Sequence, residues 1–213
     1  MGEERYDERV VGLTGGLATG ASTVAGMLTE CGALMVDADE IVHWLEGPAT
    51  SVTLAIAERF GPEALDADER VDRAWLGPRV FEDPEALRDL EAIVHPEVVA
   101  ESRRRIEALR AADPEALIIY NAPLLIERGA YKRFLTVIVV YVDDATQLKR
   151  LMARDGLSRP QALKRLAAQM VPSAKKAYAD VVIDNTGTIE ETRALVEAIH
   201  RELMSRPLLL RKD

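Results

Sequence analysis

The chain has 213 residues, of which 36 are acidic and 27 are Lys or Arg, so its formal net charge at pH 7 is −9. This balance argues against a broad nucleic-acid-binding surface, and any phosphate group must be met by a local cluster of cations. No apolar run is long enough to cross a membrane, and we expect no secretory signal in the charged first residues. The single cysteine, Cys31, cannot form an internal disulfide, which favours a reducing compartment, the cytoplasm.

The chain contains five short apolar segments that we predict to be β-strands, at residues 9–13, 33–37, 116–121, 136–142 and 181–184. Their nearly continuous apolar character is typical of parallel strands that are covered on both faces. Helical segments separate them, which predicts a doubly wound α/β fold. Ligands of such sheets bind beyond the carboxyl ends of the strands. We therefore expect one rim to be lined by Thr14, Asp37, Asn121 and residues 142–144.

A glycine-rich turn follows the first predicted strand. A phosphate-binding loop has the pattern Gly, any four residues, Gly, Lys, then Ser or Thr. Gly15, Gly20 and Ser22 match it, but Ala21 stands where lysine is expected. Glycines let backbone amides approach an anion closely, and the N-terminus of the following helix attracts it further. The pattern predicts an ATP-binding loop made of Gly15, Gly16, Leu17, Ala18, Thr19, Gly20, Ala21, Ser22 and Thr23, the alternative being a glycine-rich junction without a ligand.

The Ser22 hydroxyl is the candidate protein ligand for the Mg²⁺ ion that accompanies ATP. Ala21 removes the mobile positive charge that would follow the γ-phosphate during transfer. Loss of one preorganised charge of this kind typically lowers the rate by about 10²–10³. We therefore expect nucleotide binding to survive the change better than turnover.

The second predicted strand ends in two carboxylates, Asp37 and Asp39. At this position a carboxylate suits general base catalysis or outer-sphere contact with Mg²⁺. The alternative is an N-cap, because an aspartate there stabilises the start of a helix. We expect one aspartate in each role.

Roughly eighty residues separate the second and third predicted strands, far more than an ordinary crossover needs, which predicts an inserted helical subdomain. Apolar spacing over residues 84–111 predicts a helix, and His95-Pro96 predicts a kink or break within it. His95 is a candidate ligand contact or a histidine packed at that kink. The basic run at residues 103–105 is interpreted as a solvated helix face, with phosphate contact as the alternative.

Beyond the third predicted strand, Asn121 and Pro123 indicate the rim of a site. A helix after the fourth strand carries Arg150 and Arg154, which share a face because they are four residues apart. A second predicted helix, at roughly residues 159–170, and Lys175 continue this basic segment. It either closes over a nucleotide at the strand ends or forms solvated amphipathic helices.

Together these motifs resemble the dephospho-coenzyme A kinase family over residues 9–203. The matching pieces are GLTGG (12–16), DAD (37–39), RFG (59–61), HP (95–96), PLL (123–125) with Glu127, RLMARDGLS (150–158), QM (169–170), AD (179–180) and IDN (183–185). Each piece is short, but their order and spacing make the resemblance specific.

The resemblance implies a three-layer P-loop kinase fold with a five-stranded parallel sheet. Its core would be about residues 8–40, 114–145 and 178–204, with an inserted helical substrate domain at about 41–113 and a helical lid at about 146–177. It also implies transfer of the γ-phosphoryl group of MgATP to the 3′-hydroxyl of dephospho-coenzyme A, the last step of coenzyme A biosynthesis.

The same resemblance implies roles for particular residues. Asp39 would be the catalytic base, and Arg150 or Arg154 would be the lid arginine that steadies charge on the transferred group. The residues expected to hold the acceptor are Asp37, His43, His95, Asn121, Pro123 and Leu124.

Three positions depart from the family pattern. Ala21 replaces lysine, Asn121 replaces the aspartate usual at the end of the third strand, and His43 replaces an arginine. Ala21 and Asn121 remove one positive and one negative charge, so the local balance is partly kept. Three functions stay open: a working kinase in which Arg150, Arg154 or Lys175 replaces the lysine, a catalytically silent protein that binds nucleotide or coenzyme A, and a kinase for another small acceptor.

Overall fold

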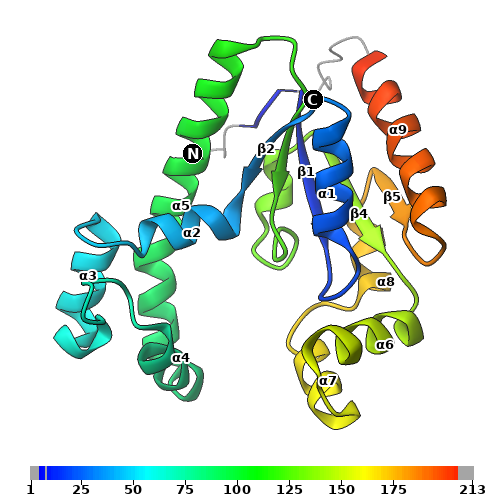
Figure 1. Cartoon of the computed structure of the whole chain (residues 1–213). Coiled ribbons are helices and arrows are strands. Elements are labelled where there is room, and N and C mark those ends of the chain that lie inside the picture. Colours follow the sequence, from blue (N-terminus) through cyan, green and yellow to red (C-terminus); the bar gives the residue numbers. More distant parts are fainter. Residues whose placement is uncertain (1–4, 8, 206–213) are drawn as a thin grey trace. The chain divides into compact units, whose positions relative to one another are not determined.

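The computed structural model describes residues 5–7 and 9–205 (Figure 1). The start of the expected core at residue 8 and the C-terminal tail, for which the sequence offers no prediction, lie outside the described residues. The chain divides into two compact units, of which the second is Asp37–Ala108 and the first comprises the described residues before and after it. No helix among the described residues is long and apolar enough to span a membrane.

The first unit is built on a five-stranded sheet with the strand order β2-β3-β1-β4-β5. The strands are β1 (Val10–Gly15), β2 (Leu34–Asp37), β3 (Ile118–Asn121), β4 (Thr136–Tyr141) and β5 (Val181–Asp184). β1 pairs in parallel with β3 and β4, so Leu13 lies opposite both Asn121 and Ile138. The predicted strands and the parallel α/β sheet are confirmed at nearly the predicted bounds.

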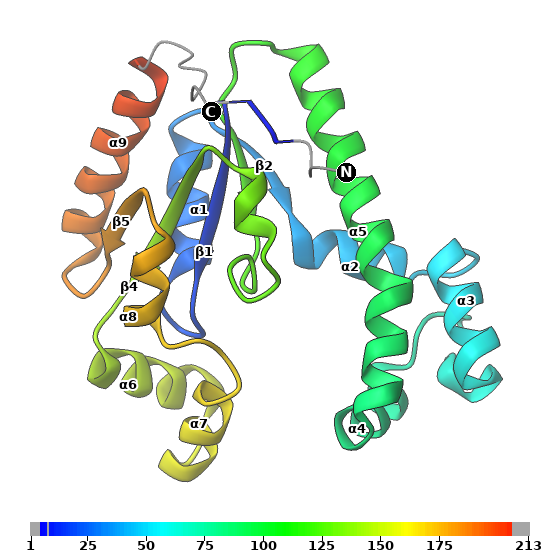
Figure 2. The same cartoon turned by 180° about the vertical axis from the view of Figure 1, so that it is seen from behind.

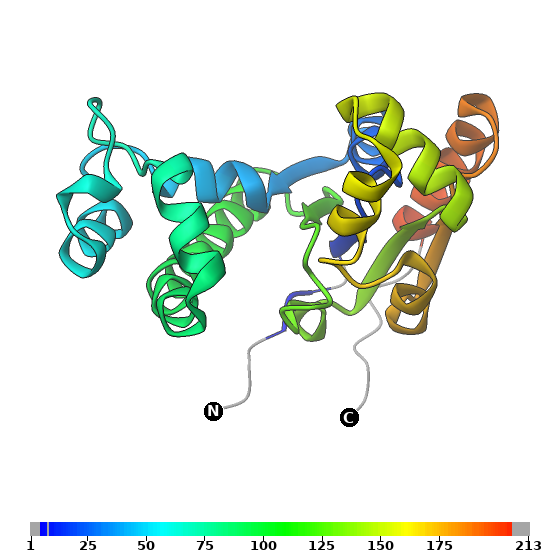
Figure 3. The ribbon, with the colours of Figure 1, turned by 90° about the horizontal axis from the view of Figure 1, so that it is seen from below.

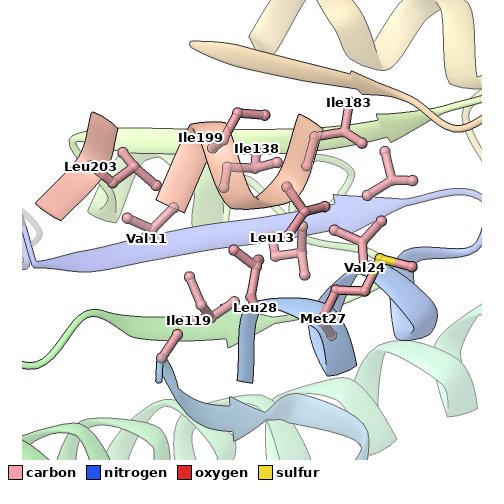
Figure 4. Close-up of a cluster of buried hydrophobic side chains, with 14 of the residues drawn as sticks. Val11, Leu13, Val24, Met27, Leu28, Ile119, Ile138, Ile183, Ile199 and Leu203 are labelled. Atoms are coloured by element: carbon pink, nitrogen blue, oxygen red, sulfur yellow. The ribbon is translucent and has the colours of Figure 1, made fainter. Parts of the chain in front are cut away.

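Helices cover both faces of this sheet. α1 (Ala21–Glu30) and α9 (Ile189–Ser205) lie side by side on one face, and α8 (Pro172–Lys175), with the short 3₁₀ helix η3 (Lys176–Tyr178), packs against β4 on the other (Figure 2). The core under α1 and α9 is drawn in Figure 4, where the labelled side chains are Val11, Leu13, Val24, Met27, Leu28, Ile119, Ile138, Ile183, Ile199 and Leu203. Coverage on both faces explains why the strands are apolar almost throughout.

Two helices follow β4 at its carboxyl end. α6 (Asp144–Asp155) starts at Asp143, whose carboxylate accepts from Thr146 N, and stops at Gly156 in the left-handed conformation, φ 63°. α7 (Arg159–Leu166) begins with a capping box between Ser158 and Gln161. The two helices pack against each other, as the yellow-green and yellow ribbons of Figure 3 show. A third short helix, η2 (Ala130–Arg133), precedes β4.

The second unit is helical. It contains α2 (Ala38–Leu45), α3 (Ser51–Phe60), η1 (Pro62–Ala64), α4 (Arg73–Glu82) and most of α5 (Pro84–Ala112). α3 is held to α5 by the Arg59–Asp89 ion pair, 2.6 Å, and by a hydrogen bond from the Ser51 hydroxyl to Glu97.

The arginine run of α5 serves the helix itself. Arg104 and Arg105 each bind the buried carboxylate of Glu101 at 2.7 Å. Hydrogen bonds from these two guanidinium groups, against the effect of burial, hold the pKa of Glu101 down to about 2. These contacts support the interpretation of residues 103–105 as a helix face and not as a phosphate site.

Of the kink or break predicted at His95-Pro96, the break is wrong. The helix continues through His95 and Pro96 to Ala112. Proline cannot donate to the carbonyl four residues earlier, which belongs to Ala92. Both Pro96 and Ala92 are exposed, so water can hydrate that carbonyl, and one missing hydrogen bond does not end so long a helix.

Candidate active site

The turn between β1 and α1 has the backbone of an anion-binding loop. Gly20 is the N-cap of α1 with φ 87°, and no side chain caps the helix, so the amides of its first turn stay open to a ligand. A Cβ at Gly15 would collide with the Thr19 hydroxyl, and one at Gly20 would collide with the Asn185 amide. Both glycines of the motif are therefore required by the geometry.

The tip of the loop is held by two glutamines that follow β4. Gln147 Nε2, on α6, donates to the Leu17 carbonyl at 2.8 Å, and Gln169 Oε1, just after α7, accepts from the Leu17 amide at 3.1 Å. The segment expected to be the lid thus contacts the loop directly. This contact has only a weak signal in the sequence, because glutamines fit any solvated helix.

The opposite side of the loop is held from β5. Asn185 Nδ2 donates to the Thr19 carbonyl at 2.7 Å, and the side-chain Oδ1 of Asn185 accepts from the Thr192 hydroxyl at 2.8 Å. Asn185 and Thr192 are both buried. Sequence reasoning assigned no role to either, although Asn185 lies in one of the pieces that carried the family resemblance.

Ala21 is the first residue of α1, and its methyl group packs against the core cluster. A Cβ at Gly15 would lie 3.1 Å from the Ala21 Cβ, so the side chain at position 21 faces the loop. A lysine at position 21 could therefore extend along the loop toward a bound phosphate, whereas the alanine leaves this position uncharged. Ser22 and Thr23 follow on the exposed side of the first turn.

A different lysine lies directly against the loop. Lys175, with 0% of its side chain exposed, donates to the Gly15 carbonyl at 3.2 Å and to the Pro123 carbonyl at 2.7 Å, and pairs with Glu127 Oε1 at 3.0 Å. An ammonium group has three protons, and these three acceptors use them all. Lys175 therefore ties the loop in place and has no donor left for a phosphate.

Glu127 completes this buried pair. Its Oε1 also accepts from the Met170 amide at 3.2 Å, while Oε2 is buried without a hydrogen-bond partner among the described residues. Burial lowers the pKa of Lys175, and the Glu127 carboxylate opposes that shift. The pair holds together the loop, the turn after β3 and the segment at Met170 that follows α7.

The two candidate lid arginines differ in their surroundings. Arg154 pairs with Asp155 at 2.7 Å, and Asp155 also binds Arg165 at 2.6 Å. Arg150 is partly buried and makes no ion pair or hydrogen bond with any described residue. It lies three residues after Gln147, whose side chain reaches the loop, so the two share a helix face. Arg150 is the better placed of the two for a ligand at the loop.

The turn after β3 makes hydrogen bonds through its backbone carbonyls. Asn121 is buried at the end of β3. The Pro123 carbonyl accepts from the Thr14 hydroxyl at 3.1 Å as well as from Lys175. The Leu124 carbonyl accepts from Arg128 N. The structure thus brings Thr14, Asn121 and Pro123 together at the loop.

In the second unit, the two aspartates have different surroundings. The Asp37 carboxylate caps α2 by accepting from Asp39 N at 2.8 Å and Glu40 N at 3.2 Å. The Asp39 side chain is left free to line a pocket of about 750 Å³ together with His43. Partial desolvation first, and the Asp37 charge second, raise the pKa of Asp39, while Arg73 opposes the shift. His95 is exposed on α5 and is not among the residues that line this pocket.

No cluster of three or more His, Cys, Asp or Glu side chains suited to a metal ion occurs among the described residues. A Mg²⁺ ion that travels with a nucleotide needs only one or two protein ligands, because phosphate oxygens and waters supply the rest. The exposed Ser22 hydroxyl, in the first turn after the loop, fits that limited role.

Comparisons with known proteins agree with this geometry. The family model for dephospho-CoA kinase matches residues 9–191. The chain is 47% identical to the dephospho-CoA kinase of Geobacter metallireducens, over 91% of this chain and 96% of that protein, and 48% identical to that of Symbiobacterium thermophilum, over 91% and 80%. The dephospho-CoA kinase structure from Campylobacter jejuni superposes with a TM-score of 0.70 at 30% identity, covering 92% of this chain and 97% of that one.

The buried lysine generates a stability prediction. Lys175→Met removes the ammonium group from the Gly15 and Pro123 carbonyls and leaves the Glu127 carboxylate without its counterion, so we expect the free energy of unfolding to fall by about 3–5 kcal/mol. Urea unfolding measures the loss.

The control is Lys164→Met on α7, an exposed position where we expect a change within about 0.5 kcal/mol. The double variant Lys175→Met with Glu127→Leu removes both charges and should recover part of the loss. Equal urea midpoints for the Lys175 and Lys164 variants would contradict the assignment.

Proposed function

The chain belongs to the dephospho-CoA kinase family, and from that premise we propose that it transfers the γ-phosphoryl group of ATP to the 3′-hydroxyl of dephospho-CoA, yielding CoA and ADP. The observation that carries the proposal is the loop between β1 and α1. It keeps both required glycines and an uncapped helix N-terminus despite Ala21. Backbone amides and the helix dipole can bind an anion without a lysine.

We propose a division of the chain in which residues 41–113 bind the acceptor and residues 146–177 act as a lid over the nucleotide. The contacts of Gln147 and Gln169 with Leu17 support the lid assignment. The pocket beside Asp39 supports the acceptor assignment. The single free cysteine, Cys31, supports a cytoplasmic location.

In the proposed reaction, Asp39 accepts the proton of the 3′-hydroxyl as its oxygen forms a bond to the γ-phosphorus and the bond to the ADP oxygen breaks. Its raised pKa suits this role, because a general base works best when its pKa approaches the working pH. Asp37 keeps the helix that carries Asp39 in place through its cap.

The proposed source of positive charge for the transferred group is Arg150, since Lys175 has no free donor and Arg154 is paired with Asp155. Mg²⁺, with Ser22 as its protein ligand, would neutralise charge on the β- and γ-phosphates. Asn121 and Pro123 form the proposed rim near the loop, and His43 belongs to the acceptor pocket.

A second function, a silent protein that binds nucleotide or CoA, is favoured by one specific observation. The lysine of the motif is absent, and Lys175, which donates to the Gly15 carbonyl, has all three of its protons bound by protein acceptors. Binding through the loop amides needs no such cation, whereas fast transfer benefits from one.

The deciding experiment measures ADP release by the purified protein with MgATP, with and without dephospho-CoA, beside an Ala21→Lys variant. We expect acceptor-dependent turnover in the unaltered protein and an increase of about 10²–10³ in kcat for the variant. Turnover only in the lysine variant would favour the silent protein. No turnover from either, although both bind ATP, would overturn the kinase proposal.

The lid assignment generates a prediction about two arginines. We expect Arg150→Ala to lower kcat by about 10²–10³, as for loss of one charge at the transferred group. Arg154→Ala, the matched control four residues along the same helix, should lower kcat far less, because Arg154 is paired with Asp155. Steady-state kinetics at saturating substrates separates the two, and a larger loss in the Arg154 variant would assign the role to Arg154 instead.

The aspartate pair generates a prediction about pH. Catalysis needs the Asp39 carboxylate deprotonated, so kcat/KM should rise as pH increases through its pKa. Asp37→Asn removes the neighbouring charge that raises this pKa, so the acid limb of the profile should move to lower pH. Asparagine still caps the helix, which keeps the fold. An acid limb that stays in place, or moves to higher pH, would exclude Asp39 as the group that titrates.

A further inference from the structure

The pocket beside Asp39 contains an arginine to which neither the motifs nor the family resemblance assigned a role. Arg70 lies between η1 and α4, is partly buried, and lines the same pocket as Asp39 and His43. Its Nη2 is 3.4 Å from His43 Nε2. In this contact the guanidinium donates and the ring nitrogen accepts, because arginine has no acceptor.

The turn that carries Arg70 is well fixed. The Asp66 carboxylate accepts from the amides of Asp68 and Arg70 at 2.9 Å each, and the Asp66 amide donates to the Arg70 carbonyl at 2.8 Å. A β-bridge between Leu65 and Val71 closes the turn on both sides. The backbone position of Arg70 is therefore set before any ligand arrives.

Arg70 has no carboxylate partner among the described residues, although two neighbouring arginines of this unit each have one. Arg59 pairs with Asp89, and Arg73 pairs with Glu46. Among the described residues, no carboxylate lies within ion-pair distance of Arg70, whose side chain contacts the His43 ring instead. A guanidinium has five N–H groups, so this contact leaves most of them for a ligand. A partly desolvated charge without a counterion favours the binding of an anion.

The other charged side chains that line the pocket are acidic, so Arg70 decides whether an anion can bind there. Asp39 and Glu40 line the same hollow, and Arg70 is the one Lys or Arg among the described residues that line it. An anionic ligand would otherwise meet two carboxylates and an imidazole. Trp44, 51% exposed, also lines the pocket and offers an aromatic face to a flat ring.

We propose that Arg70 binds the phosphate groups of the acceptor, and that His43 is a positioning residue that orients its guanidinium. The inference rests on the proposed function. Dephospho-CoA carries its reacting 3′-hydroxyl and its 5′-diphosphate on the same ribose, so one pocket must offer both a base and a cation. Asp39 and Arg70 supply these two groups. The guanidinium that the family resemblance implies at position 43 is thus delivered from position 70.

The test is direct binding of dephospho-CoA and of MgATP by calorimetry, together with KM for each substrate. For Arg70→Ala we expect the Kd and KM for dephospho-CoA to rise about 10- to 100-fold, the loss of a charge-assisted hydrogen bond, with the ATP values unchanged. Adding His43→Arg to Arg70→Ala should restore part of the affinity, which a merely structural role for Arg70 would not allow. The matched control is Arg88→Ala, an exposed α5 arginine outside the pocket lining.

The outcomes separate this inference from the kinase assignment. Equal affinity of the unaltered protein and Arg70→Ala for dephospho-CoA would overturn the subsite and leave the kinase intact. Weaker binding of ATP with unchanged binding of dephospho-CoA would place Arg70 in the donor site and also overturn it. No binding of dephospho-CoA by the unaltered protein would overturn the proposed function itself. Unchanged urea midpoints for Arg70→Ala exclude misfolding as the cause of a loss.

Discussion

The buried ammonium group of Lys175 makes the contacts on which the loop between β1 and α1 depends. It joins the last residue of β1, Gly15, to the turn at Pro123 and to the Glu127 carboxylate. Desolvating a charge is unfavourable unless every proton finds an acceptor, so the three segments must keep one arrangement. All three protons of the Lys175 ammonium group are bound by protein acceptors. These bonds hold the segments together and leave no proton for a phosphate. A lysine near a phosphate loop is therefore not, by proximity alone, a substitute for the lysine of the motif.

Because Lys175 has no proton left for a ligand, the loop would bind an anion through groups that carry no side-chain charge. The amides of the first turn of α1 are uncapped, and Gln147, Gln169 and Asn185 fix the backbone that presents them. Such an arrangement can bind an anion through dipoles held in place, without reorganisation on binding. Binding and transfer place different demands on it, because dipoles suit the ground-state phosphate, whereas transfer also needs a charge that can follow the moving group.

The sequence predicted the sheet well, because a strand that is buried on both faces is apolar at nearly every position, and this pattern can be recognised in the sequence. It also predicted that one of the two aspartates caps a helix, which Asp37 does, since an N-cap is a local property of the chain. Of the kink or break predicted at Pro96, the break was wrong, because its outcome depends on whether water reaches the Ala92 carbonyl. The roles of Lys175 and Asn185 could not be predicted, because each bonds to backbone atoms more than a hundred residues away.

The departures from the family pattern at positions 21 and 43 have different physical consequences. Comparing the sequence with the pattern one position at a time cannot distinguish them. At position 21 the side chain faces a loop whose hydrogen-bonded lysine, Lys175, already has three protein acceptors, so Lys175 does not replace the missing charge. At position 43 a guanidinium from a fixed turn contacts the imidazole and lines the same pocket, so the missing charge is supplied by another part of the chain. A motif records which residue carries a charge, whereas chemistry depends on where that charge lies. The effect of such a substitution therefore depends on whether a neighbouring cation has N–H groups that are not already bound to protein acceptors.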